Sequence, residues 1–111
     1  MLMSCAAGRP SAPQDTLLAD QGYNEMSAGN YDRAEATLNV SLSINPSNPY
    51  ALLNLGVLYQ NTGRIEEARK MYQKLIALNP GEVAAQSTSS KHEGKKLIEI
   101  ARENLDALGP P

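Results

Sequence analysis

The chain has 111 residues, a formal net charge of −2 and 41% hydrophobic residues, which fits one small domain and leaves no room for a second. Residues 1–48 carry two basic and five acidic side chains, residues 49–82 carry four and three, and residues 83–111 carry four and four. No basic stripe results, so a nucleic-acid partner is not expected. One cysteine excludes an internal disulfide, and one histidine leaves too few ligands for a structural zinc site.

Residues 1–14 are predicted to form a flexible tether. Residues 6–15 are small, Pro-rich and unpatterned, as is usual for linkers. The segment 2–5, which ends in Cys5, resembles the end of a bacterial lipoprotein signal, in which the cysteine becomes lipid-modified. The basic start and the apolar stretch of about 7–15 residues that belong to such a signal are missing. Two localisations stay open, a periplasmic or outer-membrane lipoprotein anchored through Cys5 and a cytoplasmic protein.

Residues 15–48 and 49–82 repeat one pattern with a period of 34. Six positions recur with the same residue, namely Leu18 and Leu52, Gly22 and Gly56, Gly29 and Gly63, Ala34 and Ala68, Asn45 and Asn79, and Pro46 and Pro80. This period and spacing resemble the tetratricopeptide repeat, a helix-turn-helix unit that stacks into solenoids. The resemblance implies an all-α fold of two hairpins in a short right-handed superhelix. It also implies a non-catalytic protein whose general role is to hold other proteins.

The first repeat, residues 15–48, differs from the second at two positions. It has Gln21 and Glu25 where the second repeat has Leu55 and Tyr59. We interpret the polar pair as a capped end, because nothing stacks on a terminal repeat and its outer face must be polar. The alternative is a merely degenerate repeat. The inward positions of this repeat are predicted to be Leu18, Gly22, Ala34, Leu38, Leu42 and Ile44.

In the second repeat, residues 49–82, Asn48 is a good N-cap and Pro49 suits the first helical position. Gly63 is expected to end this helix, since glycine accepts a left-handed conformation cheaply. A second helix then opens with two glutamates at its positive end and stops at Asn79. The inward positions of the two helices are predicted to be Leu52, Leu55, Gly56 and Tyr59, then Ala68, Tyr72, Leu75, Ile76 and Leu78.

Small residues at positions 56 and 68 are expected where the two helices of the second repeat cross. Gly56 and Ala68 would let the backbones approach closely there, and Ala68→Leu is predicted to cost about 1–3 kcal/mol through overpacking. After Pro80 the resemblance lapses. Residues 81–92 are predicted to be mostly loop. When the chain is divided into segments, the polar loop is assigned to residues 83–94, between the second repeat and the last helix.

A closing helix is predicted over residues 95–108. Leu97, Ala101, Leu105 and Leu108 recur at helical spacing, with Ile98 and Ile100 beside them. This helix is expected to cover the apolar side of the second repeat. A repeat stack needs about three units to be stable, so either this helix serves as the third unit or the chain dimerises.

The resemblance places the partner-binding groove on the first helix of each hairpin, on residues off the stripe that faces inside the hairpin. These residues are Ala19, Tyr23, Met26, Ser27, Tyr50, Leu53, Val57, Gln60 and Asn61. The surface is largely apolar and contains tyrosines and a methionine, which favour interfaces. It suits an amphipathic helix or a short hydrophobic peptide. The alternative is that the same residues pack against the closing helix or form the seam of a homodimer.

Other functions are not expected. Repeat proteins that clamp acidic chaperone tails use Lys, Asn and Arg in the groove, and at matching positions this chain offers only Asn54. The segment 89–96 lacks the first Gly and the final Ser or Thr of a phosphate-binding loop. His92 has no partner in the sequence that would make it a general base. The predicted function is therefore a protein-binding adaptor without metal or cofactor, either an envelope lipoprotein that assists pilus or secretion-system assembly, a cytosolic adaptor, or a self-associating module.

Overall fold

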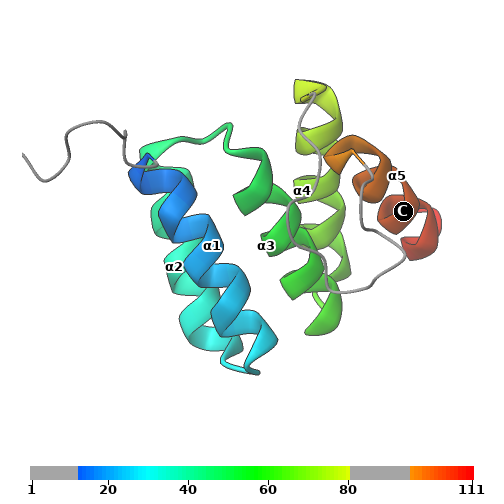
Figure 1. Cartoon of the computed structure of the whole chain (residues 1–111). Coiled ribbons are helices and arrows are strands. Elements are labelled where there is room, and N and C mark those ends of the chain that lie inside the picture. The colour runs from blue at the N-terminus through cyan, green and yellow to red at the C-terminus, as the bar shows by residue number, and fades with distance from the viewer. Residues whose placement is uncertain (1–12, 81–95) are drawn as a thin grey trace, which may run out of the picture.

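The computed structural model describes residues 13–80 and 96–111. Its helices are α1 (Gln14–Ser27), α2 (Tyr31–Ile44), α3 (Pro49–Asn61), α4 (Ile65–Leu78) and α5 (Leu97–Leu108). Figure 1 shows α1 and α2 as one antiparallel hairpin, α3 and α4 as the next, and α5 against the second hairpin. The predicted all-α stack of two hairpins with a closing helix is confirmed.

The turn inside each hairpin is the same structure built twice. Gly29 and Gly63 follow the first helix of their hairpins with φ of +88° and +82°. The amide of the next residue then reaches back to the helix, from Asn30 to the Glu25 carbonyl at 2.9 Å and from Arg64 to the Tyr59 carbonyl at 2.8 Å. Only glycine adopts this left-handed conformation without strain, which explains why it recurs 34 residues apart.

The second hairpin begins and ends as its sequence predicts. The side chain of Asn48 accepts a hydrogen bond from the Ala51 amide at 3.0 Å, and Pro49 occupies the first turn of α3. At the other end Asn79 lies in the left-handed region with φ of +50° and stops α4. Asparagine tolerates that region better than most residues.

The two helices of each hairpin meet where a glycine faces a large side chain. A Cβ on Gly22 would lie 2.5 Å from the Leu38 side chain, and one on Gly56 would clash with the Tyr72 ring. The sequence predicted Ala68 at this crossing. Ala68 is fully buried, but the side chain over Gly56 is Tyr72, one turn further along α4. The absence of a Cβ at Gly56 therefore makes room for the Tyr72 ring rather than for a second small residue.

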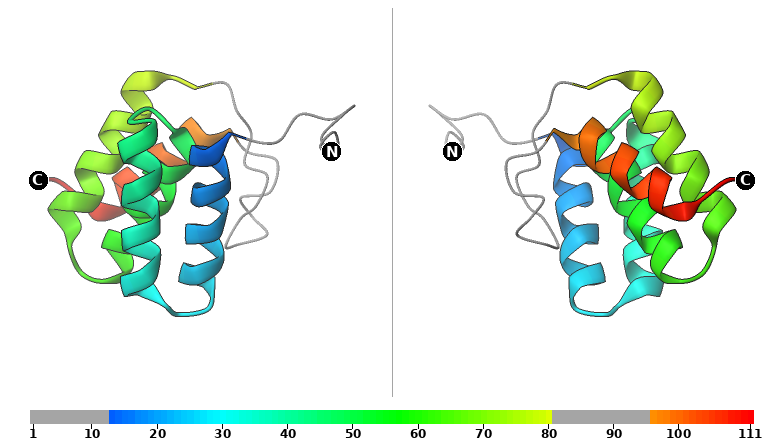
Figure 2. Two further views of the ribbon diagram at one scale, coloured as in Figure 1. Left: turned by 90° about the vertical axis from the view of Figure 1, so that its left-hand side faces the viewer. Right: turned by 90° about the vertical axis from the view of Figure 1, so that its right-hand side faces the viewer.

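The core is centred on α3, which packs against α1, α2, α4 and α5. The left view of Figure 2 shows the α1 and α2 hairpin standing in front of the second hairpin. Three predicted inward residues lie outside this core: Leu18 is half-buried outside the core cluster, whereas Ile44 is 50% exposed and Leu78 is 40% exposed. Ile44 and Leu78 are each the last residue of the second helix in their hairpin.

The closing helix packs on α4 and α3 as predicted. Leu97, Ile98, Ile100 and Ala101 are all buried. Arg69 of α4 holds the end of this helix, since its Nη1 donates to the Gly109 carbonyl at 2.7 Å while its Nε lies 3.3 Å from Glu66. Among the described residues no helix combines the length and apolar character that crossing a membrane requires.

Candidate binding site

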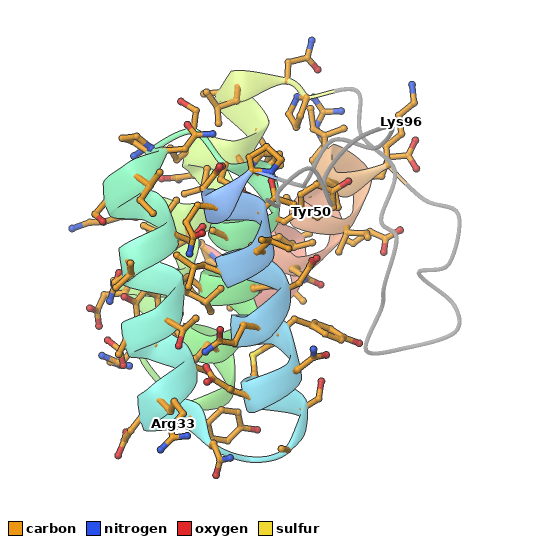
Figure 3. The ribbon with its side chains drawn as sticks, turned by 60° about the vertical axis from the view of Figure 1, so that its left-hand side comes forward. Arg33, Tyr50 and Lys96 are labelled. Atoms are coloured by element: carbon orange, nitrogen blue, oxygen red, sulfur yellow. The ribbon has the colours of Figure 1, made fainter. Side chains whose placement is uncertain are left out.

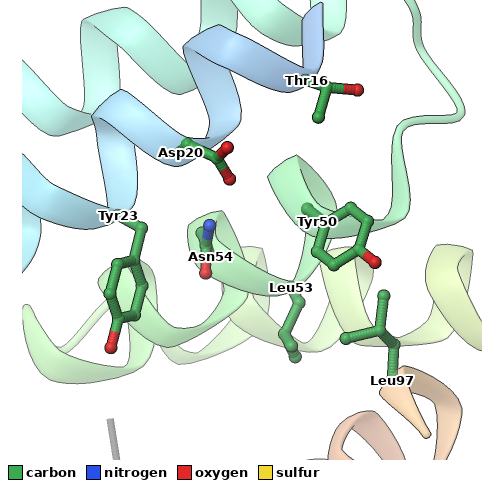
Figure 4. Close-up of a pocket in the computed structure, with 7 residues that line it drawn as sticks. All are labelled: Thr16, Asp20, Tyr23, Tyr50, Leu53, Asn54 and Leu97. Atoms are coloured by element: carbon green, nitrogen blue, oxygen red, sulfur yellow. The ribbon is translucent and has the colours of Figure 1, made fainter. Parts of the chain in front are cut away.

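A pocket of about 170 Å³ opens between three helices. One wall comes from α1, the opposite wall from α3, and one end is closed by the first residue of α5 (Figure 4). Its lining residues are Thr16, Asp20, Tyr23, Tyr50, Leu53, Asn54 and Leu97.

Helical periodicity places these side chains on facing surfaces. Thr16, Asp20 and Tyr23 stand at i, i+4 and i+7 and so share one stripe of α1. On α3, Tyr50 is followed at i+3 and i+4 by Leu53 and Asn54. The pocket is therefore the seam between two helix stripes of successive repeats.

The pocket combines an apolar floor with a polar rim. Leu53 is 8% exposed and Leu97 is 1% exposed, so both present only a small apolar surface at the bottom. Figure 4 shows Tyr23 and Tyr50 at opposite ends with Leu53 between them, and Asp20 on the α1 wall. Both tyrosines are half-buried, whereas Asp20 is exposed. This lining has the chemistry to receive an apolar side chain between two rings, with one carboxylate beside it.

Asn54 ties the two walls together. Its Nδ2 donates to the Ala19 carbonyl on α1 at 3.4 Å. The amide is thereby engaged inside the protein.

A hydrogen-bonded junction fixes the first turn of α1 beside the start of α3. The side-chain amides of Asn48 and Asn45 donate to the same oxygen of Asp15, at 2.7 and 3.0 Å. The buried Ser41 hydroxyl donates to the Asp15 carbonyl at 2.7 Å. The hydrogen bonds from Asn48 and then Asn45 lower the pKa of Asp15 below its ordinary 3.8. Because Thr16 comes next in the chain, this junction positions one end of the pocket.

A second junction links α2 to the turn between α3 and α4. The Arg64 guanidinium makes two bonds to Glu35, with Nη2 at 2.5 Å and Nη1 at 3.2 Å from the two carboxylate oxygens. The same guanidinium lies 4.5 Å from the centroid of the Tyr59 ring. Burial raises the pKa of Tyr59, and the nearby Glu35 adds to that rise. The two junctions hold the repeats at both ends of α3, so the pocket between them is preformed.

The structure divides the residues that were predicted to line the groove. Tyr23, Tyr50 and Leu53 meet in the pocket. Ala19 is 0% exposed and Met26 is 5% exposed, so these two belong to the core. Four others lie outside the lining, with Val57 and Gln60 half-buried and Ser27 and Asn61 exposed.

Gln60 faces the other side of α3. Its Oε1 accepts a hydrogen bond from the Tyr72 hydroxyl at 2.8 Å, so its amide is engaged with α4. The first-helix stripe was therefore predicted too broadly, because α3 is the central helix and has neighbours on several sides.

Three lining residues were missed by the sequence analysis. Thr16 and Asp20 carry a readable signal, since with Tyr23 they form an i, i+4, i+7 series on one helix. Leu97 carries none, because only the path of the chain brings α5 to the pocket. Cys5 and His92 lie outside the described residues, as does the predicted loop at 83–94. Within residues 13–80 and 96–111, no group of three or more His, Cys, Asp or Glu side chains could hold a metal ion.

Comparison with known proteins supports the repeat assignment. A family model described as "Tetratricopeptide repeat" matches residues 25–90, more than half of the chain. The chain is 31% identical over 115 residues to "Cellulose synthase operon protein C" of Pseudomonas fluorescens (strain SBW25), and the match covers 99% of this chain but 9% of that protein. No solved structure matches the chain. Tetratricopeptide repeats form a non-catalytic fold that generally mediates protein–protein interaction. From its internal period, its stacked hairpins and the match over residues 25–90, the chain belongs to the tetratricopeptide repeat family.

Proposed function

We propose that the chain is a non-catalytic adaptor that holds a peptide or helix of a partner protein in the pocket between α1, α3 and α5. The observation that carries this proposal is the pocket itself, in which an apolar floor lies between two half-buried tyrosines. Tyrosine gives a large contact area at a low cost in conformational entropy, which makes it a frequent anchor of interfaces. The preformed walls lower the entropic cost of binding further.

A pair of neighbouring substitutions tests the site. Tyr23→Glu places a charge inside the pocket, whereas Asn24→Glu places the same charge one residue further on, at an exposed position outside the lining. Both variants and the wild type are used as baits in native cell extract after circular dichroism has shown that they fold. A partner retained by the wild type and Asn24→Glu but lost by Tyr23→Glu supports the proposal. A partner retained equally by all three contradicts it.

Leu53 is not a suitable residue for testing the homodimer seam, because it is 8% exposed and belongs to the core. A buried carboxylate would unfold the second repeat. The self-association alternative is better tested by light scattering of Tyr23→Glu, because a seam through the pocket predicts that this variant converts a dimer to a monomer.

The place of action is a separate proposal that rests on the segment 2–5. We propose that Cys5 is the acceptor of a lipid and that the adaptor assists assembly of a machine of the bacterial envelope, such as a pilus or a secretion system. The support is the resemblance of that segment to a lipoprotein signal. Intact-mass measurement of the native protein tests it: a lipid-modified N-terminal cysteine is expected, and an unmodified Cys5 preceded by Met1 rules it out.

A further inference from the structure

The two helices that form the pocket walls carry only negative side-chain charges, and these all lie on α1. Helix α1 contains three carboxylates and no Lys or Arg, and helix α3 contains no charged residue at all. Of the three carboxylates, Asp15 is committed to Asn45 and Asn48, and Glu25 accepts a hydrogen bond from Gln21 at 3.0 Å. Asp20 remains as the acidic group that lines the pocket.

Asp20 has no cationic partner among the described residues, because the salt bridges there join Arg64 and Arg69 to glutamates and none of them involves Asp20. Arg33 lies at the far end of the first hairpin (Figure 3). Lys96 precedes α5, but its side chain points away from Tyr50 in the same view. Within residues 13–80 and 96–111 the carboxylate is thus exposed and unpaired, and it lines the same pocket as the apolar floor.

We propose that the occupant of the pocket is a peptide segment that combines an apolar side chain with an adjacent lysine or arginine. The apolar side chain contacts Leu53 and Leu97 between the two tyrosine rings. The cation pairs with Asp20, where an arginine would make two parallel bonds to the carboxylate. The acidic first repeat, with a net charge of −4 over residues 15–48, favours a basic partner for the same reason. This inference rests on the proposed function and narrows it, because it excludes acidic peptides.

A display library tests the inference without knowledge of the natural partner. Random 12-residue peptides on phage are selected against the folded wild-type chain, and the enriched sequences are synthesised with a fluorescent label. Binding is then measured by anisotropy to the wild type, to Tyr23→Glu, to Asp20→Asn and to Asp32→Asn. Asp32 is an exposed helix carboxylate on α2, outside the pocket, so its variant is a control for the loss of one negative charge.

The expected result is enrichment of peptides with Lys or Arg beside an apolar residue. Asp20→Asn should weaken their binding about five- to tenfold, as for a charged hydrogen bond near the surface, while Asp32→Asn leaves it nearly unchanged. Added salt should weaken binding to the wild type more than to Asp20→Asn.

Three other outcomes overturn the inference, and they differ in whether they also contradict the proposed function. Peptides that lack basic residues, lose binding on Tyr23→Glu and ignore Asp20→Asn would contradict the charge inference but leave the proposed function standing. Peptides whose binding ignores Tyr23→Glu as well would contradict the pocket as the site. Failure to enrich any peptide on folded protein would count against both the inference and the proposed function.

Discussion

Asp15 shows how one carboxylate can join two repeats. It accepts hydrogen bonds from Asn48 at the start of α3 and from Asn45 at the end of α2, and Asn48 in turn caps α3. The second repeat has Pro49 and Glu82 at the positions that correspond to Asp15 and Asn48. The network therefore belongs to the boundary between the repeats and not to the repeat itself.

The lowered pKa of Asp15 predicts a pH-dependent contribution to stability. The ionised form is favoured in the folded protein, so the stabilisation is fully present above the unfolded value of about 4 and is lost as pH falls through the lower folded value. Wild type should thus be more stable than Asp15→Asn at pH 7, and the gap should narrow from pH 4 downwards. Urea unfolding of both proteins between pH 2.5 and 7 measures it. A gap that is constant with pH would mean that the carboxylate charge is not used.

Gly56 and Tyr72 form a close contact between α3 and α4, in which the Tyr72 ring occupies the space that a side chain at position 56 would need. A Cβ at position 56 would clash with the Tyr72 ring, so Gly56→Ala is expected to destabilise the protein by about 1–3 kcal/mol. In a Tyr72→Ala background the ring is gone, and the same change should become neutral or stabilising by up to about 1 kcal/mol, because alanine is the better helix former. Chemical unfolding of the wild type, the two single variants and the double variant gives the four free energies of this double-mutant cycle. Equal costs in both backgrounds would show that another contact limits position 56.

At the scale of elements, α1 and α3 occupy equivalent places in their hairpins but present different outer faces. On α3, Ala51, Leu55 and Tyr59 are all buried. The corresponding α1 residues are Leu17, which is 47% exposed, and the hydrogen-bonded pair Gln21 and Glu25. One oxygen of Glu25 is shielded from solvent yet accepts no hydrogen bond within the described residues. Two of the three apolar positions on this face of α3 are therefore polar on α1.

Restoring that face should create a new contact between molecules. The double variant Gln21→Leu, Glu25→Tyr gives α1 the two residues of α3 and is expected to associate with rising concentration, since repeats stack through this surface. Light scattering over a concentration series measures it. Asp32→Leu, Ala36→Tyr puts the same residue types four apart on the exposed side of α2 and serves as the control. Equal association of both double variants would indicate nonspecific hydrophobic association. If Gln21→Leu, Glu25→Tyr stayed monomeric at all concentrations, the capping hypothesis would be contradicted.

The helices and their ends could be predicted from the sequence more fully than the residues that line the pocket. The helix ends could be predicted because their causes are local: the side chain of Asn48 caps α3, and the left-handed backbone of Gly63 and Asn79 ends α3 and α4. The residues that line the pocket were predicted only in part, because they depend on which helix lies at the centre of the fold and which of its faces stays open. Residues on α3 such as Gln60 have neighbours on two sides, and periodicity alone does not say which side is open. Leu97 reaches the pocket through a tertiary contact that no local pattern encodes.

At the scale of the whole molecule, the hairpins and α5 form a line of neighbours. The two hairpins meet through α3, and α5 packs chiefly on α4 and α3. In such arrays stability is close to a sum of unit and nearest-neighbour contributions. A defect at one end should therefore loosen the adjoining helices before the far ones, and opening should be local rather than global.

Paired cavities at the two ends test this arrangement. Ile100→Ala removes a buried side chain from α5, and Leu38→Ala removes one from α2; each is expected to cost about 2–5 kcal/mol. Hydrogen exchange followed by mass spectrometry should show protection lost mainly in α4 and α5 for Ile100→Ala, and mainly in α1 and α2 for Leu38→Ala. Since α3 contacts both ends, its amides should respond to both variants. Uniform loss along the chain in either variant would show that the junctions at Asp15 and Arg64 couple the repeats into one cooperative unit, in which case a peptide in the pocket would stabilise α5 and α2 alike.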